Sequence, residues 1–434
     1  MRVERRFDRH GQPGRAGYGG RSVPQPSTLN PQPVEGLKVV ELGELVAAPY
    51  AAKLLADLGA EVVKVEPLAG DPARRLGPFP ADVPHPERSG LFLYMNTNKR
   101  GVTLDVGTPT GRELFLRLVA WADVVIENLG PGRMDALGLC APDRLAAADG
   151  AAVVTSISPF GQSGPYRDRR ATDLVGFHMS GYGYYMGGPV EDPGAEPPLK
   201  AAGRQADFVA GINGALATLA ALFAREGSGR GQRVDVSTQE ALIPFAFGEI
   251  ARSVYEGKAP SRRAAENPPT GVVAVLPCSD GQVAISPREE HLWARWVEVM
   301  GNPAWTGDER FRDRASRAAH WAELEPLLAA WTGQRTSDEV FRAAQAVRVP
   351  AFPVNTIEEV FAWPQLAARG FFAEVVHPEA GALPYPTAPY RFSGAGWRLR
   401  RPAPLLGEHN EEVLGGWLGC SRADLVALRR AGIA

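Results

Sequence analysis

The sequence predicts an α/β protein with a parallel sheet and a second, smaller α+β domain. Three observations carry this prediction. Short β-branched segments alternate with helical segments from residue 37 onward, the pattern changes near residue 257, and 434 residues with 44% hydrophobic content can bury one large core or two ordinary ones. Residues 37–42, 49–58 and 60–65 form the first strand, helix and strand, which together make a βαβ unit.

The alternation continues and predicts a doubly wound sheet. We expect a helix over 111–121, a strand over 123–126, a short helix around Arg144 and a strand over 152–157. A Gly/Pro-rich stretch, 181–203, is too long for an ordinary connection and is interpreted as a functional loop or a flexible cover. A long Ala/Leu/Gly helix then opens at Asp207 and runs to about Arg225, and residues 232–237 return to a strand.

Four segments follow from this pattern. Residues 1–33 are rich in Arg, Gly, Pro and Gln without an apolar signal region, and predict a disordered extension. Residues 34–256 form the large domain. Residues 257–383 form the small domain, with a strand pair near 267–286 and amphipathic helices over 290–361, and residues 384–434 form a C-terminal segment with a helix over 411–418.

Composition excludes several classes of protein. Lys and Arg number 47 against 49 Asp and Glu, so there is no basic footprint for nucleic acid. No apolar run approaches the ~20 residues that span a bilayer. Three widely spaced cysteines favour reduced thiols and a cytoplasmic location, and seven scattered histidines without a ligand-type spacing predict no metal site.

The turn after the first strand, residues 43–49, lacks the glycine fingerprint of dinucleotide-binding proteins, and the chain has no Walker sequence. Nicotinamide chemistry and ATP hydrolysis are therefore disfavoured. The small residues Ala47, Ala48 and Pro49 nevertheless bring a helix N-terminus close to the strand end, where free N–H groups can receive a phosphate. Tight helix-on-sheet packing explains the same residues equally well.

Basic residues occur in three short clusters that are candidates for binding phosphates, although each residue taken alone fits a solvated surface charge. They are Arg74 and Arg75, Lys99 and Arg100, and Arg167, Arg169 and Arg170.

Asp207 lies between the Gly-rich stretch and the long apolar helix. One interpretation is a helix N-cap, whose carboxylate accepts N–H bonds from the first turn. The other is a nucleophile, because a helix N-terminus favours an ionised carboxylate and a Gly-rich approach admits a substrate carbonyl. The residues alone leave both open.

Seven segments together resemble the family III CoA transferases, a group related to the 2-methylacyl-CoA racemases. The matching segments are 37–42, 58–66, 98–105, 123–132, 229–236, 349–355 and 406–409. The resemblance implies a Rossmann-like large domain to which the C-terminal segment returns, a small domain, and an interlocked homodimer. It also implies that Asp207 forms a covalent aspartyl-CoA thioester, with an acyl-CoA donor and a carboxylic acid acceptor as substrates and no tightly bound cofactor.

The resemblance further implies a set of CoA contacts. Val46 and Ala47 correspond to the family's backbone contacts, Asn128 and Leu129 to a pair near the nucleotide, and Arg170 to a phosphate ligand. Two arginines of some members are replaced by Ala136 and Pro67, and Arg133 and Arg74 are expected to substitute from nearby. The family's glycine-rich flap corresponds to 267–271, which lacks a glycine run, so 181–203 is a second candidate cover.

Two other functions remain as alternatives. A racemase of this family needs a His before an Asp, and this chain has Thr172 before Asp173, which cannot serve as the base near neutral pH. A non-catalytic subunit of a heteromeric transferase is the second alternative. The acceptor acid is not identifiable, although Tyr182, Tyr184, Tyr185 and Met186 are candidates for an acyl pocket or for loop packing.

Overall fold

A computed structural model describes residues 31–139, 152–257, 261–264 and 271–434. Its centre is a six-stranded parallel sheet with strand order β3-β2-β1-β4-β5-β6. The strands are β1 Lys38–Leu42, β2 Glu61–Glu66, β3 Lys99–Thr103, β4 Val124–Glu127, β5 Val153–Ser158 and β6 Arg233–Ser237. The predicted doubly wound α/β sheet is confirmed. The strand order reverses between β1 and β4, and a sheet of this type opens a crevice at the carboxyl ends of those two strands.

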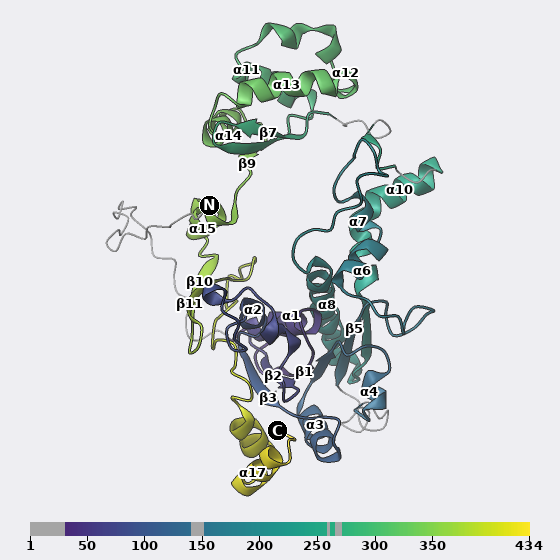
Figure 1. Ribbon diagram of the computed structural model, residues 1–434, viewed down its shortest axis with the longest axis vertical. Helices are drawn as coiled ribbons and strands as arrows, with labels where there is room; N and C mark the ends of the chain where they lie inside the picture. Colours follow the sequence, from purple (N-terminus) through teal and green to yellow (C-terminus); the bar gives the residue numbers. More distant parts are fainter. Residues whose placement is uncertain (1–30, 140–151, 258–260, 265–270) are drawn as a thin grey trace, which may run out of the picture.

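Helices cover both faces of the sheet (Figure 1). Val39 and Val62 pack with α1 (Ala47–Asp57) and α8 (Gln205–Ser228), whereas their neighbours Val40 and Val63 pack with α3 (Pro109–Trp121). Successive strand residues point to opposite faces, so a sheet buried on both sides needs unbroken apolar runs. The β-branched strands found in the sequence meet this need.

Helix α8 corrects one expectation. By length and composition, it is the helix in the described part of the chain that could cross a membrane, so a run of that size does exist. In the structure α8 packs along α1 and against β5, and Gly214 lies so close to Ile157 that a Cβ there would be 2.7 Å from the Ile157 side chain. One face of α8 is therefore used in helix-on-sheet packing, whereas Leu216 and Phe223 on the same helix are 65% and 77% exposed.

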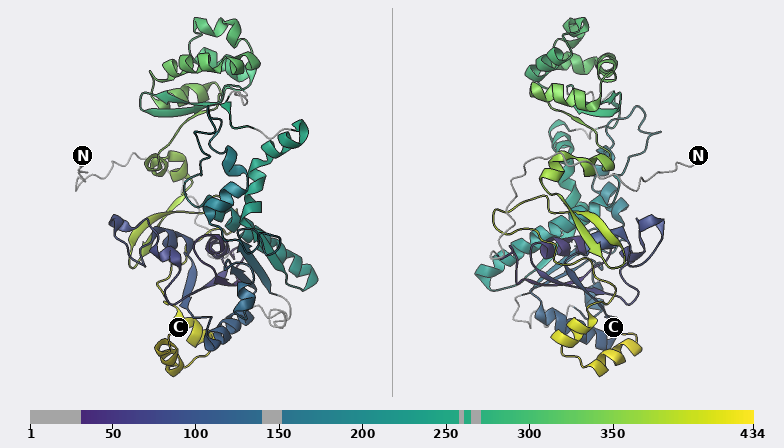
Figure 2. Two further views of the ribbon diagram at one scale, coloured as in Figure 1. Left: turned by 45° about the vertical axis from the view of Figure 1, so that its right-hand side comes forward. Right: turned by 90° about the vertical axis from the view of Figure 1, so that its left-hand side faces the viewer.

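The small sheet stands apart from the large one, as Figure 2 shows from two further sides. It is antiparallel and has three strands, not the predicted pair: β7 Ala274–Cys278, β8 Gly281–Ile285 and β9 Ala351–Pro353. Its core includes Trp296 and Leu324 from the covering helices α11 Glu290–Val299, α12 Arg314–Ala319, α13 Trp321–Thr332 and α14 Ser337–Ala346.

A hairpin of β10 (Phe372–His377) and β11 (Gly381–Pro386) follows. Most of it falls within 257–383, the range predicted for the small domain, but Val375 and Tyr385 pack against Phe92 and Leu93 beside the large sheet. The remaining helices are α2 Gly90–Met95, α4 Arg133–Ala136, α6 Asp173–Met179, α7 Tyr182–Tyr185, α9 Thr238–Leu242, α10 Phe247–Glu256, α15 Ile357–Ala362, α16 Pro364–Ala368 and α17 Arg422–Arg430.

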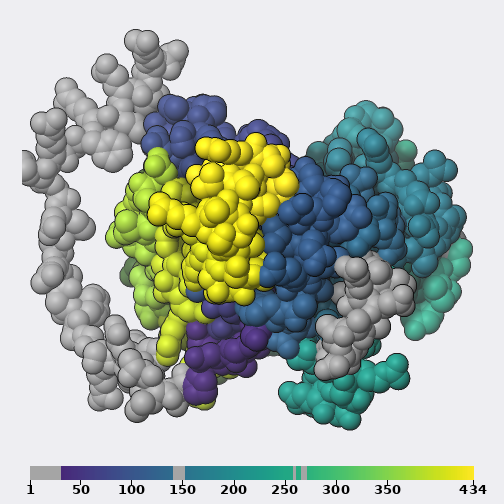
Figure 3. All heavy atoms as spheres, turned by 90° about the horizontal axis from the view of Figure 1, so that it is seen from below, coloured from purple at the N-terminus to yellow at the C-terminus, as the bar shows by residue number. Residues whose placement is uncertain are grey.

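The C-terminal segment closes the large domain. Val413 and Leu414 enter the same core as Phe115, and the Asn98 N–H donates to the Arg401 carbonyl. Figure 3 shows this segment lying against the surface formed by residues near 100–140. The helix predicted over 411–418 is a π-helix, Glu411–Trp417. The expected helix around Arg144 and nearly all of the expected 1–33 extension lie outside the described residues.

Candidate active site

A cavity of about 510 Å³ lies at the carboxyl ends of β1, β4 and β5, where the strand order reverses. Its lining comes from the β1–α1 loop, the β4 and β5 ends, α6, the segment before α8, and α9. The residues are Leu45, Val46, Ala47, Asn128, Ile157, Ser158, Pro159, Ala171, Thr172, Asp173, Leu174, Gly176, Lys200, Arg204, Asp207 and Thr238. The cavity thus brings together four residues predicted from sequence: Val46, Ala47, Asn128 and Asp207.

The β1–α1 loop is fixed by hydrogen bonds from two neighbouring segments. Asn128 Oδ1 accepts the Glu44 N–H at 2.8 Å, and Asn128 Nδ2 donates to the Glu44 carbonyl at 2.9 Å. Leu45 has a φ of 62°, a left-handed conformation that is unfavourable for leucine, and its N–H donates to Asp71 Oδ1 at 3.0 Å. These bonds hold Val46 and Ala47 at the cavity wall, so Asn128 acts on the loop as well as lining the cavity.

Asp207 is the third residue of α8, and its side chain is 19% exposed. The interpretation of Asp207 as the helix N-cap is wrong, because Arg204 occupies the cap position and makes no side-chain cap bond. Instead Arg204 Nη1 lies 3.3 Å from Asp207 Oδ2. The Asp207 N–H donates to Asp173 Oδ1 at 3.2 Å, and Asp173 Oδ2 pairs with Lys200 Nζ at 2.7 Å.

Burial raises the pKa of Asp207 to about 6, and the Asp173 carboxylate adds to this effect, while Arg204 and Lys200 oppose it. Asp207 is therefore ionised at neutral pH but poorly solvated. A carboxylate in this state has lost much of the water shell that an attack on a carbonyl would have to displace, which suits it to nucleophilic chemistry.

Close packing of α8 on α1 places Asp207 beside the loop. A Cβ on Gly211 would lie 2.8 Å from the Ala47 carbonyl oxygen, so glycine is needed for the approach. One turn earlier, the Tyr50 and Phe208 rings pack edge to face with centroids 4.7 Å apart. The distance between the nucleophile candidate and the Ala47 backbone is consequently set by side-chain size at this crossing.

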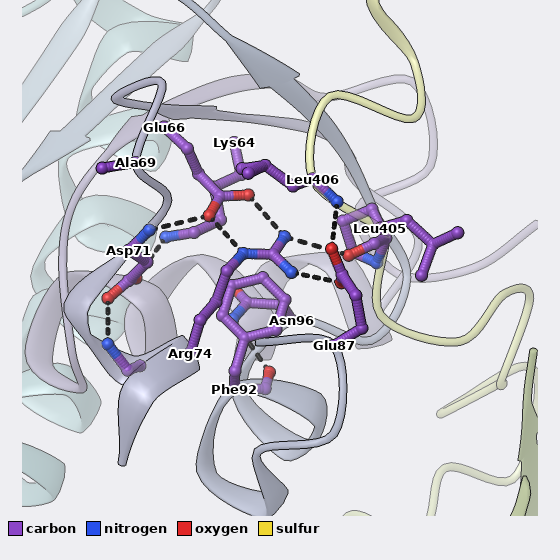
Figure 4. Close-up of polar contacts among 12 residues, drawn as sticks. Lys64, Glu66, Ala69, Asp71, Arg74, Glu87, Phe92, Asn96, Leu405 and Leu406 are labelled. Atoms are coloured by element: carbon purple, nitrogen blue, oxygen red, sulfur yellow. Dashed lines mark hydrogen bonds and ion pairs between the residues drawn. The ribbon is translucent and has the colours of Figure 1, made fainter. Parts of the chain in front are cut away.

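Arg74 does not line the cavity. Figure 4 shows its guanidinium between Glu66 and Glu87, at 2.7 Å and 2.5 Å, and it stacks on the Phe92 ring at 3.6 Å. Arg74 is 1% exposed, and it also donates to the Pro404 carbonyl at 3.1 Å. A guanidinium that is buried and held by two carboxylates and a carbonyl is not placed to meet a phosphate, which argues against the predicted substitution by Arg74.

Lys99 and Arg100 are likewise engaged elsewhere. Lys99 is fully buried, pairs with Glu41 at 2.6 Å and donates to the Pro49 carbonyl at 2.7 Å. Arg100 pairs with Glu61 and Glu412. Neither lines the cavity, so the structure does not support their predicted phosphate role.

Arg133 and Arg170, the other two basic residues predicted to contact CoA, are exposed. Arg133 opens α4 just after β4, and Arg170 directly precedes the lining residue Ala171. Arg167 Nη2 lies 3.7 Å from the position that a Cβ on Gly132 would take, next to Arg133. Leu129 is half-buried, and its N–H donates to Glu127 Oε2 at 2.7 Å.

Sequence reasoning missed Lys200 and Arg204 as site residues, and considered Asp173 only as a feature of racemases. Arg204 stands one helical turn before Asp207, a spacing that places the two side chains together once the helix start is known. Lys200 and Asp173 are 27 positions apart, and no local pattern connects them. Among the residues that the structure describes, no group of three or more His, Cys, Asp or Glu side chains is arranged to hold a metal ion.

Comparison with known proteins shows the family of this chain. A family model described as CoA-transferase family III matches residues 34–410. The chain belongs to CoA-transferase family III. The matched range includes both sides of the cavity, from the β1–α1 loop to Asp207 and Thr238.

Relatives of this CoA transferase cover almost the whole chain. A succinyl-CoA–D-citramalate CoA-transferase of Chloroflexus aurantiacus is 32% identical over 92% of this chain and 97% of its own. A subunit of the succinyl-CoA:(R)-benzylsuccinate CoA-transferase of Thauera aromatica is 35% identical over 87% and 92%. The crystal structure of a CaiB/BaiF family protein from Brucella suis matches with a TM-score of 0.78 at 32% identity, over 91% of this chain and 100% of that one.

Proposed function

We propose that this enzyme transfers CoA from an acyl-CoA donor to a free carboxylic acid through a covalent aspartyl-CoA thioester on Asp207. The observation that carries the proposal is the position of Asp207, a largely buried carboxylate with a pKa raised to about 6, in the cavity that the β1–α1 loop also lines. The family membership supplies the reaction class, acyl-CoA to carboxylate transfer.

The chemistry proceeds through four acyl transfers. Asp207 attacks the donor thioester, the C–S bond breaks, and the products are a mixed anhydride and CoA thiolate. The thiolate attacks the Asp207 carbonyl and expels the donor acid as a carboxylate. The acceptor carboxylate then attacks the aspartyl thioester and releases the thiolate again. Finally the thiolate attacks the acceptor's carbonyl, which yields the new acyl-CoA and restores ionised Asp207.

The CoA contacts follow from the same cavity. We assign the pantetheine arm to Val46 and Ala47, where the loop is held by Asn128, and the nucleotide side to Leu129. Arg133 and Arg170 are assigned to the phosphates, because both are exposed and, among the described residues, neither takes part in the buried ion pairs that hold Arg74 and Lys99.

The relatives indicate the class of substrates. Both are named for succinyl-CoA, and their other named acids, D-citramalate and (R)-benzylsuccinate, are dicarboxylic acids. Succinyl-CoA as donor and a dicarboxylic acid as acceptor are therefore the first pair to examine.

A dimer is proposed because α10 presents an uncovered apolar face. Phe247, Ile250, Val254 and Tyr255 are 72%, 45%, 73% and 87% exposed, and the first three recur at helical spacing. Phe223 on α8 is 77% exposed. A second copy of this chain, interlocked with the first, would cover such surfaces. One relative is a subunit, so purification must also establish whether this chain works without a different partner.

Racemisation has no support in the cavity. Thr172 occupies the position where racemases of this family need a His, and its hydroxyl does not ionise near neutral pH. His178, on the same helix α6, does not line the cavity.

Asp207→Ala tests the proposal. We expect no measurable CoA transfer from succinyl-CoA to a panel of dicarboxylic acids, while CoA binding measured by calorimetry stays within about threefold of wild type, because the substitution removes the nucleophile and little binding surface. Hydroxylamine should trap an aspartyl derivative at residue 207 in wild type alone. Asp338→Ala, an exposed carboxylate on α14, is the matched control. Turnover above a few per cent in Asp207→Ala would rule out the covalent role.

A further inference from the structure

Two cations line the cavity within the described part of the chain, and they differ in how their donors are used. Lys200 Nζ has three partners: Asp173 Oδ2 at 2.7 Å, the Ala201 carbonyl at 3.0 Å, and the Gly203 carbonyl. An ammonium group has three N–H donors, so Lys200 is saturated. Its contacts fix the turn that leads into α8.

Arg204 is not saturated. Among the described residues, its guanidinium makes one polar contact, the 3.3 Å approach of Nη1 to Asp207 Oδ2, which is long for a charge-assisted bond. A guanidinium carries five N–H donors, and the Arg204 side chain is 34% exposed and lines the cavity. The geometry therefore leaves donors beside the nucleophile that can bind a second oxygen anion.

The charge of the cavity changes during the proposed reaction in a way that frees Arg204. In the resting enzyme the guanidinium faces ionised Asp207. When Asp207 carries CoA as a thioester, its negative charge is gone, and a partly desolvated cation is left without its anion. Leaving such a cation uncompensated is costly, so any carboxylate that enters at this stage gains a partner.

We propose that Arg204 is the binding site for the carboxylate of the acceptor acid, and that this site opens when Asp207 becomes acylated. The inference rests on the covalent mechanism proposed above. Arg204 exchanges one carboxylate for another: it holds Asp207 at rest, the donor acid as that acid departs, and the acceptor acid as it arrives. The guanidinium matches the two oxygens of each.

Binding at Arg204 also orients the attack. A carboxylate held on this guanidinium lies next to the Asp207 carbonyl carbon. One of its oxygens forms the bond to that carbon, the C–S bond of the thioester breaks, and the electron pair leaves with the CoA thiolate. Substrate positioning of this kind supplies a large share of rate enhancement in bimolecular reactions.

The first experiment uses binding of succinate as a probe, at pH 8, where Asp207 is ionised. If Asp207 and the free acid compete for Arg204, then Asp207→Ala must bind succinate more tightly than wild type does, by about tenfold in Kd. The double variant Asp207→Ala with Arg204→Gln must lose this gain. Asp207→Ala with Arg342→Gln, which removes an exposed arginine of α14, must keep it. Equal affinity in wild type and Asp207→Ala would overturn the inference.

The second experiment separates acceptor from donor. In Arg204→Gln at pH 8 we expect KM for the acceptor acid to rise at least about tenfold, with KM for succinyl-CoA changed less than about threefold. Arg204→Lys retains the charge but not the two-pronged geometry. Its KM for the acceptor acid must lie between the values of wild type and Arg204→Gln. An equal rise in both KM values, or none, would contradict a role for Arg204 in acceptor binding.

Failure of the broader proposal gives a different result. A wild-type enzyme that transfers CoA to none of the acids, yet shows the succinate pattern above, would retain Arg204 as a carboxylate site and refute the transferase mechanism. If the wild-type enzyme transfers CoA and Arg204→Gln behaves as wild type, the transferase mechanism is retained and the role of Arg204 is refuted.

Discussion

Asp207 combines two properties that an exposed carboxylate cannot have together: it is ionised at neutral pH, and it is largely removed from water. Burial and Asp173 raise its pKa to about 6, and Arg204 and Lys200 keep the rise moderate. A stronger rise in this pKa would leave the proposed nucleophile protonated near neutral pH. If the Asp207 carboxylate were as fully hydrated as one at the surface, it would be a weaker nucleophile in the proposed reaction. The three flanking charges set the balance between these two limits.

The same charges predict how activity depends on pH. In the proposed mechanism only ionised Asp207 attacks the thioester, so kcat/KM should fall tenfold per pH unit below about pH 6 and level off above it. In Asp173→Asn the carboxylate that raises the pKa of Asp207 is gone, so the acidic limb should move to lower pH. Lys200→Met removes a cation that lowers this pKa, and the limb should move to higher pH.

Asp168→Asn is the control for this pair, because Asp168 is exposed and pairs with Arg167 outside the cavity. Its pH profile should match that of wild type. Shifts of Asp173→Asn and Lys200→Met in the same direction would show that these residues act on structure and not on the charge of Asp207.

Asp207 and Ala47 were singled out from their places at helix starts, and Val46 and Asn128 through the family resemblance. All four line one cavity at the strand ends of the parallel sheet. Their part in the reaction stays a prediction. The sequence also suggested Arg74 as a phosphate ligand, whereas the structure buries this residue between two carboxylates. The partners that bury Arg74 stand 8 and 13 residues away, and Pro404 is 330 positions distant. Charged residues give the same local sequence pattern whether the fold buries them in ion pairs or leaves them exposed to solvent.

At the scale of elements, the crossing of α8 over α1 sets the site. Gly211→Ala would place a Cβ 2.8 Å from the Ala47 carbonyl, so α8 must move away and carry Asp207 with it. We expect transfer activity to fall about 10- to 100-fold, since displacements near 1 Å cost that much in positioned reactions.

Gly227→Ala in the same helix is the matched control. A Cβ there meets nothing within 4 Å, so this substitution should leave activity unchanged and stabilise the helix by about 0.5–1 kcal/mol. Urea unfolding and steady-state kinetics on both variants provide the comparison. Full activity in Gly211→Ala would show that the crossing tolerates displacement.

The ion-pair cluster around Arg74 joins β2, α2 and the C-terminal segment. Arg74→Gln leaves Glu66 buried without its partner, so we expect a loss of about 3–5 kcal/mol in the free energy of unfolding. Arg75→Gln is the control, because Arg75 lies next to Arg74 in the sequence but donates to the Ala69 carbonyl at the surface. A phosphate ligand would behave in the opposite way, raising KM for CoA substrates without destabilising the fold.

Five strands of the large sheet were predicted, because buried parallel strands need unbroken β-branched runs, which the sequence displays there. Strand β3 was not predicted, since it opens with Lys99, Arg100 and Gly101. The third strand of the small sheet, β9, was not predicted either. Its three residues include Pro353, and it pairs with β8 from more than sixty positions away. Short strands with proline carry no periodic signal, and only the tertiary structure assigns them.

For the whole molecule, the exposed face of α10 predicts a dimer that does not separate on dilution. Sedimentation of wild type at nanomolar concentration should show dimer alone, since interlocked chains must partly unfold to part. Val254→Asp places a charge in the apolar face and should yield monomer or aggregate. Val426→Asp on α17 is the control, and a folded wild-type monomer would refute the interlocked arrangement.

The return of the C-terminal segment to the large domain bears on how the protein is made. The six strands of the large sheet have left the ribosome once residue 237 has emerged. Val413 and Leu414, which cover the core beside Phe115, are synthesised nearly last. The nascent chain therefore carries an unsealed apolar face for the second half of its synthesis. A chain truncated just after residue 400 would keep that apolar face exposed permanently, and chaperones would retain it and proteases degrade it.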